Sequence, residues 1–236
     1  MSDGPSQRQF RRYHILLPFL HRPSFRAKRV RAGWTCDLSE GGVCVELDQS
    51  LPASTYLQVR LQTDRGVIYA DAEVIWVETP LGRQGRSLHG LALARLAPEQ
   101  LQSLQYLLLS WGLGRRAGGV RIPFHAPVTC QYKGQPGPLI TGYGHDGSRN
   151  GLLLRLPQVV PPDTTLELTL HTHQGPLTVE GVVVWVAPPE GRSPGGPIRH
   201  GLRLTTLGWP TALALGLALV EPPKNTPWRA PREGSA

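Results

Sequence analysis

The sequence lacks any long hydrophobic run. Its longest apolar segments, such as ALALGLALV, fall far short of the roughly 20 residues that a helix needs to cross a bilayer. The first residues, MSDGPSQRQFRR, contain no apolar core of signal-peptide length. We therefore expect a soluble, cytoplasmic protein without membrane insertion.

The sequence also has few residues suited to redox, metal or nucleophilic chemistry. Its three cysteines, Cys36, Cys44 and Cys130, include no C-x-x-C pair, so we expect apolar or half-buried thiols without a disulfide framework. None of the eight histidines is spaced from a cysteine, serine or acid as a zinc site or a triad requires. His171 and His173 would share one face of a strand, and a surface pair is the simpler interpretation. We expect no enzyme, no metal and no resident cofactor.

Turn-forming residues, in contrast, are abundant. The 236 residues include 27 glycines and 23 prolines, while only 18% are charged and 40% are hydrophobic. This balance favours a mainly β protein with many turns and enough apolar residues for real cores. The length suits one large domain or two of about 100 residues each.

Positive charge is concentrated at the N-terminus. The formal net charge is +8, and nearly all of the excess precedes Asp37. A basic arm on a near-neutral body indicates an anionic partner, such as nucleic acid, a membrane surface or a phosphate-bearing small molecule, although a solvated arm without function is the alternative. Residues 1 to about 14 have too little apolar content to fold alone. The basic residues are Arg8, Arg11, Arg12, Arg22, Arg26, Lys28, Arg29 and Arg31.

The chain contains one internal repeat. An Asp-x-Ser-x-x-Gly motif occurs twice, and each of its residues returns 109 positions later: Asp37, Ser39 and Gly42, then Asp146, Ser148 and Gly151. The same shift relates Trp76 to Trp185. A period this long exceeds that of stacked solenoid repeats, so it indicates two domains of similar fold.

Each repeat reads as short strands followed by a helix. Alternating β-branched runs such as GVIYADAEVIWV and GPLTVEGVVVWV indicate strands, and PEQLQSLQYLLLSWG and WPTALALGLALVE indicate helices. We predict two tandem small antiparallel β-barrels, each followed by a C-terminal helix. The predicted domains are 1–111 and 120–221, with a Gly-rich linker at 112–119 and a disordered tail at 222–236. Trp76 and Trp185 are expected in the cores, and His89 and His200 are expected to serve packing.

Two motifs together carry a family resemblance. Arg8 and Arg12 form R-x-x-x-R, which precedes the motif of Asp37, Ser39 and Gly42. In this order and spacing, with the β pattern downstream, the sequence resembles the PilZ family of cyclic di-GMP receptors. The resemblance implies a ligand site made by Arg8, Arg12, Asp37, Ser39, Gly41 and Gly42.

The chemistry of these residues suits that ligand, which carries two phosphates and two guanines. A guanidinium can bind a phosphate, or the O6 and N7 edge of guanine, with two parallel hydrogen bonds. The Asp37 carboxylate can accept from the guanine N1–H and amine, and Ser39 can bond a base or a phosphate. Gly41 and Gly42 are interpreted as leaving room for the ligand to approach backbone N–H groups.

The second repeat keeps only part of this pattern. Arg12 corresponds to Arg121, whereas Arg8 corresponds to Ala117, with Arg116 one place out of register. Asn150 stands where the first repeat has Gly41. Either a weak second site remains, made by Arg121, Asp146, Ser148 and Gly151, or this domain is a structural and interaction module. We favour the module.

The resemblance implies a receptor that passes its signal to a protein partner. Ligand binding would order the basic arm and reorient the second domain, and the partner would belong to motility, pilus, polysaccharide or transcription machinery. Whether one or two ligands bind stays open. The alternative function is a single-stranded nucleic-acid-binding β-barrel, which would stack bases on Phe10, Tyr13, Phe25 and Trp34 beside the basic arm.

Overall fold

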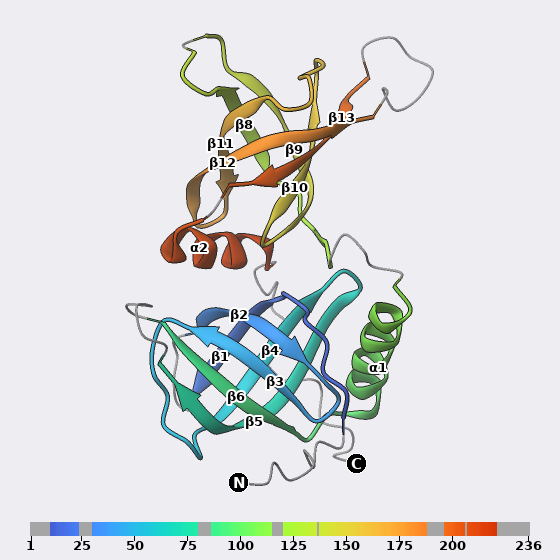
Figure 1. Ribbon diagram of the computed structural model, residues 1–236, viewed down its shortest axis with the longest axis vertical. Coiled ribbons are helices and arrows are strands. Elements are labelled where there is room, and N and C mark those ends of the chain that lie inside the picture. The colour runs from blue at the N-terminus through green and yellow to red at the C-terminus, as the bar shows by residue number, and fades with distance from the viewer. Residues whose placement is uncertain are drawn as a thin grey trace, which may run out of the picture. The chain divides into compact units, whose positions relative to one another are not determined.

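Two compact units make up the chain, the first preceding residue 120 and the second beginning at Val120. The computed structural model describes residues 10–23, 30–79, 86–114, 120–135, 137–187, 196–205 and 207–220 (Figure 1). Each unit consists of a β-barrel and one helix. Neither of the two described helices has the length and apolar character needed to cross a membrane. The predicted linker from residue 115 and the predicted tail lie outside the described residues.

The first unit is a closed barrel of six antiparallel strands. Its strands follow the order β1-β2-β3-β6-β5-β4, and β1 pairs with β4 to close it. The strands are β1 (Pro18–Pro23), β2 (Arg31–Leu38), β3 (Gly42–Leu47), β4 (Tyr56–Thr63), β5 (Gly66–Glu78) and β6 (Ser87–Ala94). Closure leaves no strand edge open for pairing with another chain.

Large apolar side chains fill this barrel, and a helix follows it. Leu17, Phe19 and Trp34 are completely buried, and each contributes roughly 1.5–3 kcal/mol by leaving water. Helix α1 (Pro98–Gly112) begins with a proline in its first turn and buries Leu104, Leu107 and Leu108. A proline suits this position because the first helical N–H groups have no partner within the helix.

The second unit repeats the design with one added strand. The barrel runs β9-β10-β13-β12-β11-β8, closes through the β8–β9 and β9–β10 pairs, and carries β7 alongside β9. Two tandem antiparallel barrels, each followed by a helix, confirm the predicted fold class. The elements are β7 (Ile122–Pro123), β8 (Pro127–Tyr132), β9 (Ile140–Ser148), β10 (Gly151–Leu156), β11 (Thr165–Thr172), β12 (Gly175–Val186), β13 (Ile198–Leu204) and α2 (Trp209–Leu219).

A β-bulge precedes the motif aspartate in both units. In the β2–β3 pair, Thr35 lies opposite Val45 and Asp37 lies opposite Cys44, so Cys36 is the extra residue. In the β9–β10 pair the extra residue is His145. A bulge bends its strand and changes the direction of the side chains around it. The repeat therefore preserves a local distortion as well as a strand order.

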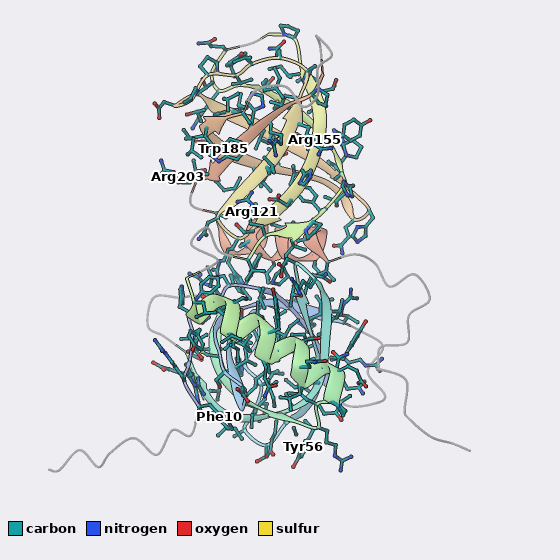
Figure 2. The ribbon with its side chains drawn as sticks, turned by 90° about the vertical axis from the view of Figure 1, so that its right-hand side faces the viewer. Phe10, Tyr56, Arg121, Arg155, Trp185 and Arg203 are labelled. Carbon is teal, nitrogen blue, oxygen red and sulfur yellow. The ribbon has the colours of Figure 1, made fainter. Side chains whose placement is uncertain are left out.

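The two repeated tryptophans are not core residues, and that prediction was wrong. Trp76 and Trp185 are 38% and 45% exposed, and each directly follows a bulge in its own strand, β5 or β12. Their indoles lie against Gly90 and Gly201, where a Cβ atom would overlap the indole nitrogen. Figure 2 labels Trp185 on the second barrel. The bulge adds a residue to the strand, which shifts the inward and outward alternation expected from sequence.

The histidines that precede these glycines are buried, as expected. The Nε2 atom of His89 accepts a hydrogen bond from the Leu51 backbone N–H at 2.9 Å, and that of His200 accepts one from Val160 at 3.0 Å. His89 thus fixes the loop after β3, and His200 fixes the corresponding loop after β10. Burial lowers the pKa of both rings, which keeps them neutral as these acceptor roles require.

Candidate ligand-binding site

The chain is attached to the first barrel from Tyr13 onward. Tyr13 and Leu38 exchange two backbone hydrogen bonds of 2.9 Å, and the Leu17 N–H donates to Thr35 Oγ1 at 2.8 Å. Tyr13 also packs against the end of α1, where a Cβ atom on Gly112 would come within 2.9 Å of its hydroxyl. Tyr13 is therefore held by the barrel, and the expectation that residues 1 to about 14 do not fold alone stays a prediction. Arg8 lies outside the described residues.

Arg12 and Asp37 come together at this junction. Arg12 Nη1 donates to Asp37 Oδ1 at 2.9 Å, and both side chains are 33% exposed. A salt bridge at this exposure contributes at most about 1 kcal/mol, because water competes for both charges. The pair is therefore held in place and yet is easily opened by a ligand with better partners for each group.

The turn after Asp37 is closed by its own serine. Ser39 N–H and its hydroxyl both donate to the Gly42 carbonyl, at 2.9 and 3.1 Å. Ser39 itself is buried. Its hydroxyl oxygen keeps acceptor capacity, but its proton is already used within the turn.

The two glycines of the turn lie close to neighbouring groups of different rigidity. A Cβ atom on Gly41 would lie 2.8 Å from the Phe10 ring, and one on Gly42 would lie 2.6 Å from the Leu91 carbonyl oxygen. Phe10, labelled in Figure 2, therefore packs on Gly41 in the direction that a side chain there would take. Gly42 allows β3 and β6 to approach closely. The interpretation that these glycines let a ligand approach the backbone stays a prediction.

A groove of about 450 Å³ lies next to this turn, between the arm and α1. Phe10, Arg11 and Glu40 line its arm side, and α1 supplies the opposite wall. Glu40 accepts a hydrogen bond from Gln105 of α1 at 3.1 Å, which ties the turn to the helix. The Arg11 guanidinium lies 5.1 Å from the centre of the Tyr13 ring, within cation–π range.

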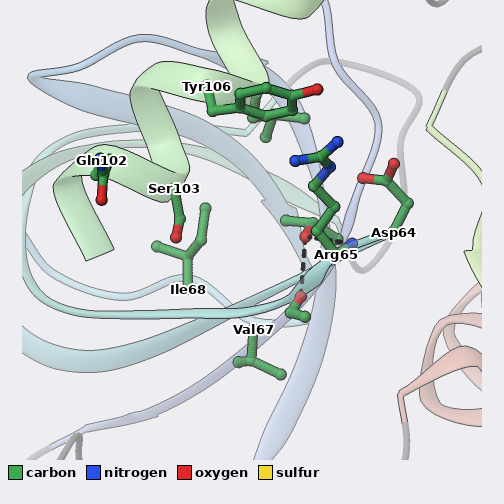
Figure 3. Close-up of a pocket in the computed structure, with 10 residues that line it drawn as sticks. Asp64, Arg65, Val67, Ile68, Gln102, Ser103 and Tyr106 are labelled. Carbon is green, nitrogen blue, oxygen red and sulfur yellow. Dashed lines mark hydrogen bonds between the residues drawn. The ribbon is translucent and has the colours of Figure 1, made fainter. Parts of the chain in front are cut away.

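A smaller pocket of about 280 Å³ lies between the β4–β5 turn and α1 (Figure 3). Arg65 covers the Tyr106 ring there at 3.9 Å, and Thr63 Oγ1 donates to the Gly66 carbonyl at 2.9 Å. Neither Arg12 nor Asp37 lines it. The pocket is therefore separate from the motif residues.

The second unit forms the corresponding pair in a more enclosed setting. Arg121 Nε donates to Asp146 Oδ1, and His145 Nδ1 lies 3.2 Å from Asp146 Oδ2. Asp146 is only 16% exposed, about half the exposure of Asp37. Ser148 donates to the Gly151 carbonyl at 3.4 Å, as Ser39 does to Gly42. Both oxygens of this carboxylate already have partners, so it is less available to a ligand. Arg116 and Ala117 lie outside the described residues.

Sequence reasoning found Arg12 and Asp37 but missed two features beside them. One is the contact of Phe10 with Gly41, for which the only signal was the position of Phe10 inside R-x-x-x-R. The other is the closeness of Cys36 and Cys44, which depends on the bulge. Among the residues that the structure describes, no group of three or more histidine, cysteine or acidic side chains could hold a metal ion.

Comparison with known proteins gives the family. The PilZ domain profile matches residues 6–110 and 115–208, whereas no curated protein matches. Similar solved structures include the PilZ domain with c-di-GMP of YcgR from Escherichia coli, 16% identical, covering 48% of this chain and 97% of its own, with a TM-score of 0.39. PlzA of Borreliella burgdorferi in complex with c-di-GMP is 13% identical over 86% of this chain and 88% of its own, with a TM-score of 0.36. Apo MrkH of K. pneumonia is 12% identical over 86% and 85% respectively, also with a TM-score of 0.36.

The profile matches rest on sequence and extend over both units, which carry the same order of strands around the same motif. The chain therefore belongs to the PilZ domain family, with one PilZ domain in each unit.

Proposed function

We propose that the protein is a cyclic di-GMP receptor whose first unit holds the ligand. The proposed contacts are Arg8, Arg12, Asp37 and Ser39, with the backbone around Gly41 and Gly42. The observation that carries the proposal is the exposed Arg12–Asp37 pair, which presents a cation and an acceptor 2.9 Å apart at the barrel surface. Cyclic di-GMP offers a phosphate to the first and a guanine donor edge to the second.

The expected affinity follows from these contacts. Charge-assisted hydrogen bonds contribute roughly 1.5–3 kcal/mol each. Four or five of them, less the cost of ordering the arm, leave about 7–10 kcal/mol, which corresponds to low micromolar or tighter binding. Opening the Arg12–Asp37 pair subtracts little, because the pair is exposed to solvent.

We further propose how binding becomes a signal. A ligand held by Asp37 and Arg12 would draw Arg8 toward the turn and order the residues before Phe10, at a cost of about 1–2 kcal/mol for each residue fixed. The altered arm, or a changed orientation of the two domains across residues 112–119, would then be recognised by a protein partner. This proposal keeps domain limits of 1–111 and 120–221, and α1 extends one residue beyond the first.

Isothermal titration with cyclic di-GMP tests the ligand. We expect saturable binding in the micromolar range or below, with one or two ligands per protein. Absence of both heat and thermal stabilisation at about 100 µM ligand, near −5.5 kcal/mol, would reject the proposal.

The nucleic-acid alternative is weakened by one observation. Trp34 is completely buried, so it cannot stack on a base, and Phe25 lies outside the described residues. Salt dependence separates the two functions, because binding to a polyanion weakens steeply with salt in proportion to its phosphate contacts. A compact ligand with two phosphates should show a much shallower dependence.

A further inference from the structure

Two of the three cysteines lie side by side at the proposed site. Asp37 of β2 lies opposite Cys44 of β3, and the bulge inserts Cys36 directly before Asp37. The Cys36 and Cys44 side chains are hydrogen-bonded to each other. Cys130 belongs to the other unit, where its thiol donates to the Ile140 carbonyl at 3.5 Å.

These two thiols share the electrostatic environment of the ligand-binding pair. The hydrogen bond with Cys36 and then burial raise the pKa of Cys44, and the Asp37 charge raises it further while Arg12 opposes the effect. Cys44 is only 6% exposed, whereas Cys36 is half-buried. Cys36 is therefore the thiol that an oxidant in solution can reach, and Cys44 is placed to resolve the product.

We propose that Cys36 and Cys44 form an oxidation site for hydroperoxides, and that their disulfide weakens cyclic di-GMP binding at Asp37 and Arg12. The second half of this proposal rests on the proposed function. The first half, formation of the disulfide, does not.

The chemistry balances with a hydroperoxide as the oxidant. The Cys36 sulfur attacks the peroxide oxygen, the O–O bond breaks, and an alcohol or water leaves as Cys36 becomes a sulfenic acid. The Cys44 sulfur then attacks the Cys36 sulfur, loses its proton and expels water. Two thiols are oxidised by two electrons and one peroxide bond is reduced.

The local backbone suits this bond. Cys36 and Asp37 share the position opposite Cys44, because two residues of a bulged strand face one residue of its partner. Disulfides join Cα atoms about 4.4–6.8 Å apart. A disulfide is about 2.05 Å long, well below the separation of two hydrogen-bonded sulfurs. Closing that gap draws Cys36 toward β3, and because Asp37 is the next residue we expect its carboxylate to shift relative to Arg12.

Thermodynamic linkage makes the effect reciprocal. If the disulfide weakens ligand binding by some factor, ligand must disfavour the disulfide by the same factor. We expect roughly tenfold, the equivalent of about 1.4 kcal/mol, because one charge-assisted contact is misaligned. The effect of the ligand on the disulfide can therefore be measured directly. The fraction of disulfide in a glutathione buffer should fall when cyclic di-GMP is added.

The experiment compares full-length protein before and after treatment with hydrogen peroxide. Peptide mapping without reductant should show residues 36 and 44 linked in the wild type and in Cys130→Ser, and unlinked in Cys36→Ser and Cys44→Ser. Titration with cyclic di-GMP should show about tenfold weaker binding after oxidation, restored by a dithiol reductant. Restoration in the same sample separates the disulfide from overoxidation and needs no variant to fold.

Each outcome decides one half of the proposal. Failure to find the linked peptide in folded protein overturns the oxidation site. A linked peptide with affinity unchanged within about twofold overturns the coupling. Absence of binding by the reduced protein overturns the proposed function and with it the coupling, while the peptide map still decides the oxidation site.

Discussion

Arg12 differs from its basic neighbours in the partner it has. Its guanidinium is paired with Asp37 at the surface, whereas Arg22 Nε donates to Gln58 of the barrel at 2.8 Å. A ligand can bind Arg12 and Asp37 while they stay close together. To bind the Arg22 Nε–H it must first break the hydrogen bond to Gln58. Basic residues of equal charge are therefore expected to differ in their contribution to binding.

The first prediction compares these two arginines. Arg12→Ala should weaken cyclic di-GMP binding by about 1.5–3 kcal/mol, because it removes a charge-assisted contact. Arg22→Ala should cost under about 1 kcal/mol at physiological salt, since only the local field changes. Titration calorimetry measures both. Equal small losses would indicate a diffuse electrostatic arm in place of a specific anchor.

The second prediction concerns the glycines of the turn. Gly42→Ala should destabilise the first unit by about 1–3 kcal/mol, because the new methyl meets a backbone carbonyl that cannot move aside. Gly41→Ala meets only the half-exposed Phe10 ring, so its cost to stability should stay below about 1 kcal/mol. It should nevertheless disturb the arm and weaken ligand binding.

Phe10→Ala provides the control for Gly41→Ala. In that background Gly41→Ala should have no further effect on affinity, since the ring that it displaces is gone. A double-mutant cycle measures this coupling. Additive losses in affinity would show that Gly41 acts on the ligand directly, as the sequence first suggested.

The sequence predicted that Arg12 and Asp37 belong to one site, but it did not predict the contacts of the residues around them. The spacing of R-x-x-x-R and Asp-x-Ser-x-x-Gly identified Arg12 and Asp37, which the structure brings into contact. What Gly41 touches depends on how the arm returns across β2. That path is fixed by the Tyr13–Leu38 hydrogen bonds, which no local pattern specifies.

At the scale of elements, the bulges explain what periodicity could not. Alternation located the strands, because outward and inward side chains repeat every second residue. An inserted residue reverses that alternation, and nothing in the composition of the strand marks it. Counting every second residue therefore placed Trp76 and Trp185 in the cores, whereas the bulge turns them outward. The repeat did contain the signal, since each tryptophan returns together with the His-Gly pair that accommodates it. Interpreting that signal requires knowing that the tryptophan and the glycine are neighbours across β5–β6 and β12–β13.

The third prediction tests this packing in the second unit. Gly201→Ala should displace the Trp185 indole, shift its N–H signal in an NMR spectrum, and destabilise the unit by about 1–3 kcal/mol. Gly137→Ala is the matched control, because beyond its chain neighbours the nearest described atom to an added Cβ there is the Gln135 carbonyl oxygen, 4.0 Å away. It should change stability by under about 0.5 kcal/mol. Equal losses in thermal stability would mean that the indole–glycine contact has no special cost.

At the scale of the whole molecule, the two units differ in what their aspartates can do. The fourth prediction is that Asp37→Ala abolishes cyclic di-GMP binding, while Asp146→Ala leaves the affinity of the first site nearly unchanged. Asp146 is held by Arg121 and His145, and the arginine corresponding to Arg8 is missing there. Titration of both variants gives affinity and stoichiometry. Comparable damage from the two substitutions would restore the second unit as a ligand site.

Hydrogen exchange on the same pair of variants tests the proposed signal. Ligand should slow exchange at the amides of residues 5–20 in the wild type and in Asp146→Ala, and leave Asp37→Ala unaffected. Saturated binding without any change in exchange would contradict the ordering of the arm.

A buried histidine connects the stability of the first barrel to pH. His21 is completely buried, its ring stacks on Phe19 with centroids 5.7 Å apart, and neither ring nitrogen has a hydrogen-bond partner within the described parts of the chain. Burial, then the nearby charge of Arg31 and repulsion from His89 when that ring is protonated, lower the pKa of His21 from 6.5 to about 4. The ring therefore stays neutral in the folded barrel well below the pH at which it gains a proton in the unfolded chain.

The fifth prediction follows from that difference. Between about pH 6.5 and pH 4 only the unfolded state carries the His21 proton, so stability should fall as pH falls, by up to about 1.4 kcal/mol per pH unit. Above pH 6.5 His21 should contribute no slope. His21→Leu should reduce the slope of unfolding free energy against pH in this window by the contribution of about one proton. His89 continues to contribute to the slope because its pKa is also lowered. Exchange of the slowest amides of the first unit at several pH values gives its unfolding free energy separately from that of the second. Parallel curves for wild type and His21→Leu would show that the ring is protonated equally in both states, and hence that its burial does not govern its charge.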